Sequence, residues 1–91
     1  MKIKESFTAR QDFGYRFISS FQKTVASLPS CVYIGLGDGE ERLANAKSII
    51  GTFSLQIGNG IDFSVIVMND NEDIAQGDMA IIKEWLRANE V

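Results

Sequence analysis

The stretch Ile61-Asp62-Phe63-Ser64-Val65-Ile66-Val67 decides the fold, because it is the clearest strand in the sequence. Successive side chains of a strand point to opposite faces. One face of this strand is therefore wholly apolar, since it carries Ile61, Phe63, Val65 and Val67. A turn at Gly58-Asn59-Gly60 precedes the strand, and a loop with capping residues follows it at Asn69-Asp70-Asn71.

Amphipathic helices are predicted both C-terminal and N-terminal to this strand. The first runs from about Glu72 to Ala88, with an apolar stripe of Ala75, Met79, Ile82 and Leu86 widened by Ile81 and Trp85. The second runs from about Tyr15 to Leu28, where Phe17, Phe21, Thr24, Val25 and Leu28 recur three or four residues apart. Pro29 ends it, because the residue before a proline is biased away from the helical region.

The remaining segments complete a β-α-β-β-α-β-α order. Strands are expected at Ile3 to Thr8 and Cys31 to Leu36, with a turn at Gly37-Asp38-Gly39 leading into a returning strand from Glu40. A short helix of about two turns, with Ser48 at or just inside its N-cap, is expected to end near Gln56. This order predicts a single α+β domain over residues 1–91, an open-faced sandwich whose three helices cover one face of a four-stranded antiparallel sheet.

Composition excludes several classes of function. The chain has no histidine, one cysteine and a net charge of −3 with scattered basic residues. Imidazole chemistry, a metal centre and a nucleic-acid surface are therefore not expected, and no cofactor is implied. Cys31 is expected to pack like a small hydrophobe in its strand, and a lone thiol fits the cytoplasm. No segment is long and apolar enough to span a membrane. We expect a binding protein and not an enzyme.

The most informative motif is the run from Asn45 to Gly58, NAKSIIGTFSLQIG. Its large apolar residues, Ile49, Ile50 and Phe53, lie on a helix too short to bury all of them. One interpretation is a cap followed by core contacts. The other is an exposed apolar patch beside Ser48, which would form a docking surface. A phosphate on Ser48 would then add charge at the positive end of the helix and change which partners the patch accepts.

At these residues the sequence resembles HPr, the histidine phosphocarrier family of the bacterial phosphotransferase system. NAKSIIGTFSLQIGNG (residues 45–60) is similar to the family's segment N-x-K-S-I-M-G-x-M-S-L-G-x-x-x-G around its regulatory serine. The resemblance implies the same sandwich, a role in the regulation of sugar transport and a serine, here Ser48, that HPr kinase phosphorylates in many Gram-positive members. In members without such a kinase, the serine acts as a helix cap.

The first third of the chain departs from the family. HPr carries its phosphate on a histidine in a G-[IL]-H-A-R-P-A stretch, which corresponds here to Phe13-Gly14-Tyr15-Arg16-Phe17-Ile18-Ser19. The histidine position is held by Tyr15 or Arg16, depending on where the alignment is anchored. The glycine-rich hairpin is also longer than the family's by about three residues. A histidine-less branch of the family keeps the serine and acts only in regulation, which sets a precedent.

The resemblance implies protein partners: HPr kinase, an enzyme I-like protein or a transcription regulator. The expected contact residues are Arg16, Lys47, Ile49, Ile50 and Phe53. The leading hypothesis is thus a degenerate HPr-like module, a monomer or weak homodimer, that docks through the Ser48 helix. Two alternatives stay open. One is a structural or assembly domain that reuses the fold, and the other is an unconventional phosphotransfer component with Tyr15 as the acceptor.

Overall fold

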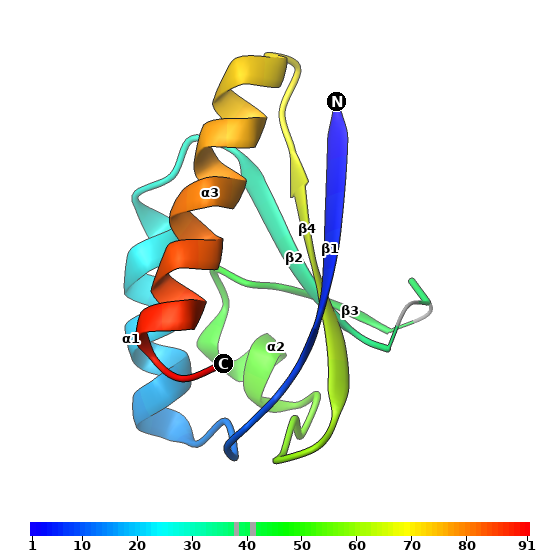
Figure 1. Cartoon of the computed structure of the whole chain (residues 1–91), viewed down its shortest axis with the longest axis vertical. Coiled ribbons are helices and arrows are strands. Elements are labelled where there is room, and N and C mark those ends of the chain that lie inside the picture. Colours follow the sequence, from blue (N-terminus) through cyan, green and yellow to red (C-terminus); the bar gives the residue numbers. More distant parts are fainter. Residues whose placement is uncertain (38, 41) are drawn as a thin grey trace.

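A computed structural model of the chain describes residues 1–37, 39–40 and 42–91. Its strands and helices alternate in the predicted order (Figure 1). They are β1 (Lys2–Thr8), α1 (Tyr15–Ala26), β2 (Cys31–Leu36), β3 (Leu43–Asn45), α2 (Ile49–Phe53), β4 (Asp62–Met68) and α3 (Glu72–Ala88).

The sheet has the strand order β1-β4-β2-β3, and every pairing in it is antiparallel. β4 is central, with Val65 opposite Glu5 of β1 on one side and Ile34 of β2 on the other. All three helices lie on the same side of the sheet (Figure 1). The predicted α+β open-faced sandwich is thereby confirmed.

The core lies between the sheet and the helices. Phe63, Val65 and Val67 of β4 are fully buried there, as the alternation of the strand predicts. Aromatic rings connect the sheet to the helices. Phe13 packs edge-to-face against Phe63 of β4, and Phe17 of α1 packs in the same way against Trp85 of α3; the ring centroids lie 5.2 Å apart in both pairs. The rings before and within α1 therefore join the central strand to α3.

The opposite face of β4 is buried as well, although the sequence predicts an open face. Ser64 and Ile66 are almost inaccessible to solvent. The β2–β3 hairpin projects on the side of the sheet away from the helices (Figure 1), and Gly37 at the end of β2 lies against Ser64. Ser64 donates its hydroxyl hydrogen bond to the Gly37 carbonyl, and the Gly37 N–H donates to Asp62 O at 2.8 Å.

Two contacts fix the hairpin in this position. A Cβ added at Gly35 would lie 2.7 Å from Leu43 Cδ2 and 3.2 Å from the Arg42 carbonyl oxygen, so the close approach requires glycine. Across the sheet, the Lys2 ammonium donates to Glu40 and lowers the pKa of that carboxyl. Glu40 is solvent-exposed, as its charge predicts.

Several local predictions differ from the structure. α2 has only five residues instead of two turns, and the returning strand β3 begins at Leu43 instead of Glu40. Cys31 is exposed, because it lies opposite Met68 on the face of the sheet away from the helices. Ile81 is also exposed, since it falls off the buried stripe of α3. Asp38 and Glu41, in the expected turn and returning strand, lie outside the described residues.

That buried stripe includes an acid, Asp78. Its Oδ2 accepts hydrogen bonds from the Ser30 N–H at 3.2 Å and from the Ser30 hydroxyl at 2.5 Å. Ser30 Oγ in turn accepts from Asn69 Nδ2 at 3.1 Å. Asp78 therefore holds the α1–β2 loop and the end of β4 against α3, and its burial is compensated by these partners. Among the described helices, none is long and apolar enough to cross a membrane.

We expect Asp78→Ala to lower the free energy of unfolding by about 2 kcal/mol, because it leaves the buried Ser30 N–H and hydroxyl without their acceptor. Urea denaturation measures the change. Asp73→Ala is the matched control, since Asp73 is an exposed acid in the first turn of the same helix and should cost less than about 1 kcal/mol. Equal losses in the two variants would contradict this account of Asp78.

Candidate functional site: the surface formed by the second helix and the start of the first

Ser48 is the N-cap of α2, as predicted. Its backbone is extended, with φ −104° and ψ 116°, and its Oγ accepts a hydrogen bond from the Gly51 N–H at 3.1 Å. Its carbonyl accepts the next helical bond, from the Thr52 N–H, at 3.1 Å. The hydroxyl group itself stays on the solvent-exposed side of the helix start, because Ser48 is an exposed residue.

The helix is short because the chain that follows it returns to the core. Leu55 and Ile57 are buried, and Gln56 between them adopts a positive φ of 54° that a helix cannot contain. Within the helix, only Thr52 is fully buried. The five-residue helix is therefore anchored on one side only, and Ile50 and Phe53 face outward.

Tyr15, the first residue of α1, lies beside these outward residues. Tyr15, Ile49, Ile50, Phe53 and Ser54 line an almost wholly apolar hollow of about 250 Å³. Ile50 is 84% exposed, Tyr15 66% and Phe53 50%. We call Tyr15, Ile49, Ile50 and Phe53 the α2 surface. The structure thus brings together three of the predicted contact residues, Ile49, Ile50 and Phe53, around a tyrosine.

The two basic residues of the predicted site are placed differently from each other. Lys47 is half-buried, and its ammonium donates to the Leu28 carbonyl oxygen at 2.9 Å, while its own carbonyl accepts from Gln22 Nε2 at 3.2 Å. Lys47 therefore links the segment that precedes α2 to α1 and to the loop that follows α1. Arg16 is exposed on α1, directly after Tyr15. Ile49 is half-buried and packs against the core, so it forms the floor of the α2 surface.

The start of α1 is where the resemblance places a histidine. Gly14 is the N-cap, with extended backbone angles and no side-chain cap, and α1 begins at Tyr15. The exposed Tyr15 side chain lies over the α2 hollow. From the sequence, Tyr15 was considered as one of two residues that could replace the histidine and as an alternative phosphoryl acceptor, but not as part of the apolar surface. Neighbouring aromatic residues at positions 13, 15 and 17 gave no signal that only Tyr15 would be exposed.

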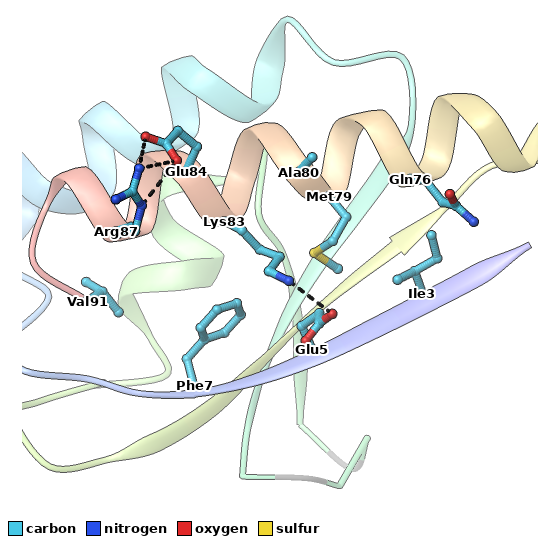
Figure 2. A pocket seen from close by; sticks show the side chains of 10 residues that line it. All are labelled: Ile3, Glu5, Phe7, Gln76, Met79, Ala80, Lys83, Glu84, Arg87 and Val91. Carbon is cyan, nitrogen blue, oxygen red and sulfur yellow. Dashed lines mark hydrogen bonds and ion pairs between the residues drawn. The ribbon is translucent and has the colours of Figure 1, made fainter.

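Two other places in the described structure were considered as sites: groups of metal-binding side chains and the hollow between β1 and α3. Within the described part of the chain, no three acidic, cysteine or histidine side chains are grouped to hold a metal ion. A larger hollow of about 600 Å³ lies between β1 and α3 (Figure 2). Its charged side chains pair with each other, Lys83 with Glu5 at 3.5 Å and Arg87 with Glu84 at 2.6 Å. The Glu84 carboxylate raises the pKa of Arg87.

Comparison with solved structures identifies the fold as that of the HPr phosphocarrier proteins. A histidine-containing phosphocarrier protein of Mycoplasma superposes with a TM-score of 0.73 at 20% identity, covering 98% of this chain and 94% of the other. HPr from Bacillus anthracis gives 0.66 at 23% identity, covering 88% and 95%. HPr-C-His from Thermoanaerobacter tengcongensis gives 0.63 at 20% identity, covering 88% and 86%. No protein-family model and no curated protein sequence matches the chain.

Gly51 is the residue on which the cap of α2 depends. A Cβ at this position would lie 3.1 Å from Ser48 Oγ and 3.4 Å from Ser48 Cβ. We expect Gly51→Ala to displace the capping hydroxyl, so that the loss of the cap, about 1 kcal/mol, offsets the gain in helix propensity and leaves the free energy of unfolding, measured by urea denaturation, little changed.

Gly77→Ala is the control for this prediction. Gly77 lies inside α3, is exposed and has no atom within 4 Å of its added Cβ. Alanine there should stabilise the protein by roughly 0.5–1 kcal/mol through helix propensity alone. The account of the cap is wrong if both substitutions stabilise the protein.

Proposed function

We propose that this chain is a regulatory, protein-binding module of the phosphotransferase-system type, which docks partners through the α2 surface. The observation that carries the proposal is the exposure of Ile50, Tyr15 and Phe53 around one apolar hollow. Exposed aromatic and large aliphatic side chains that converge on a hollow are typical of protein–protein contacts. The fold shared with HPr proteins supports partners from the same system: HPr kinase, an enzyme I-like protein or a transcription regulator.

The module does not act as a phosphohistidine carrier. The 91 residues contain no histidine, whereas one of the structures of similar fold is described as a histidine-containing phosphocarrier protein. Tyr15 and Arg16 stand at the start of α1, where the resemblance places that histidine. A tyrosine hydroxyl is a weak nucleophile unless a neighbouring base activates it. The start of α1 therefore contributes contact area to the α2 surface and not a phosphoryl acceptor.

Phosphorylation of Ser48 would regulate this docking. The exposed Ser48 hydroxyl attacks the γ-phosphorus of ATP, an Oγ–P bond forms, the bond to ADP breaks, and the hydroxyl proton passes to a base of the kinase. Ser48 also lines a second hollow together with Tyr15, Gln22, Lys47, Ile49 and Ile50. A phosphate here adds about −1.5 to −2 charges at the edge of the apolar surface, so it changes which partners the surface accepts.

We expect Ile50→Asp to weaken binding to the partner by at least tenfold, because it places a charge in the centre of the apolar contact. Isothermal titration calorimetry with HPr kinase, with an enzyme I-like protein and with a transcription regulator of this system would measure it. Ile81→Asp is the matched control, since Ile81 is an exposed isoleucine on α3, outside the α2 surface.

Equal effects of the two substitutions would contradict the assignment of the surface. If none of the three partners binds, and if sedimentation velocity instead shows self-association that Phe53→Asp abolishes, the chain is an assembly domain. Self-association is the second candidate function, because the hollow is lined by no charged side chain that would repel the same surface of a second copy.

Incubation with ATP and HPr kinase should add one phosphate to the wild type, detected by intact mass, and none to Ser48→Asn. Asparagine is the suitable substitution because it retains an N-cap acceptor, so its fold stays intact while the hydroxyl is lost. If the wild type is not modified, the proposed regulation by Ser48 phosphorylation is wrong, and only the proposed protein-binding role remains. Labelling of Tyr15 by enzyme I and phosphoenolpyruvate would instead favour unconventional phosphotransfer.

A further inference from the structure

Ser48 stands between two hollows on opposite sides of α2. One is the hollow shared with Tyr15 and Ile50, next to the α2 surface. The other, of about 440 Å³, lies on the β3 side of the helix. Its lining is Arg42, Leu43, Ala44, Asn45, Ser48, Gly51, Ser54 and Leu55. A group attached to Ser48 Oγ therefore has two directions in which to lie.

The hollow on the β3 side is lined by one cationic side chain, whose backbone is held in the hairpin. Among its lining residues, Arg42 is the one charged side chain. The backbone of Arg42 is held by the hairpin, which packs so closely over Gly35 that the Arg42 carbonyl oxygen lies 3.2 Å from where a Cβ would be. Its guanidinium is exposed and donates from Nη2 to the Ser54 carbonyl oxygen at 3.3 Å, a long and weak bond.

We propose that Arg42 is the intramolecular ligand of a phosphate on Ser48, and that it draws this phosphate into the hollow on the β3 side of α2. The proposal rests on the phosphorylation of Ser48 put forward above. Arginine forms two parallel hydrogen bonds to a phosphate, each stronger than a bond to a neutral carbonyl. The guanidinium would therefore exchange the Ser54 carbonyl for the phosphate, which would tie the hairpin to the start of α2.

Lys47 is the obvious competitor, since it directly precedes Ser48. Its ammonium is already engaged with the Leu28 carbonyl oxygen at 2.9 Å, on the α1 side. Moving it to the phosphate would break a half-buried hydrogen bond, whereas moving Arg42 breaks an exposed one. The phosphate would thus be held away from Tyr15 and Ile50. The charge that changes which partners the α2 surface accepts would therefore lie at the hairpin edge of that surface.

The test uses protein synthesised with phosphoserine at position 48, so that no kinase is needed. The phosphate is titrated by phosphorus NMR in the wild type, in Arg42→Gln and in Lys47→Gln. We expect the midpoint of the wild type to lie about half a pH unit below that of Arg42→Gln, because an adjacent guanidinium favours the dianion. Arg42→Lys should restore part of the shift, and Lys47→Gln should move the midpoint less than Arg42→Gln does.

Equal midpoints in the wild type and Arg42→Gln overturn the proposal, as does a larger effect of Lys47→Gln. Arg42 is exposed, so its substitution should leave the fold intact, and circular dichroism of each variant checks this. The outcome is independent of the proposed function. If HPr kinase fails to modify Ser48, the regulatory role fails, while the encoded phosphoserine still shows whether Arg42 binds it.

Discussion

The burial of β4 on both faces is the constraint on which the rest of the structure depends. Phe63, Val65 and Val67 need the helices to cover them, while Ser64 and Ile66 need a cover on the opposite face. The β2–β3 hairpin provides part of that second cover by folding over Gly35 and accepting the Ser64 hydrogen bond. The hairpin is therefore part of the packing of the sheet, and it also brings Arg42 to its place beside α2.

The α2 surface results from a similar balance between anchored and exposed residues. The Ser48 cap, the buried Thr52 and the returning Leu55 fix a very short helix in one orientation. Their anchoring leaves Ile50 and Phe53 uncovered next to Tyr15. A longer helix would have turned more apolar residues inward. The backbone under the α2 surface is thus held by a capping hydrogen bond and by buried side chains on either side of the exposed ones.

The strands, the long helices and the Ser48 cap followed from local patterns, because alternation, helical spacing and capping chemistry depend on near neighbours in the sequence. The exposed state of Ile50 and Phe53 followed from the shortness of their helix. Other features depend on contacts between distant residues. The exposure of Cys31, the cover over Ile66 and the burial of Asp78 against Ser30 are set by which strand or loop lies opposite. The contribution of Tyr15 and the position of Arg42 were beyond sequence reasoning for the same reason.

The strand order also has a consequence for the synthesis of the chain. β1 pairs only with β4, and β4 is the last strand to leave the ribosome. Until residues 62–68 have emerged, β1 has no partner and β2 can pair only with the three-residue β3. Until then the apolar β2 has one edge unpaired, which leaves it open to wrong pairing or to chaperones. The sheet then forms late, through pairing of residues 2–8 with residues 62–68, and such long-range pairing is slow compared with helix formation.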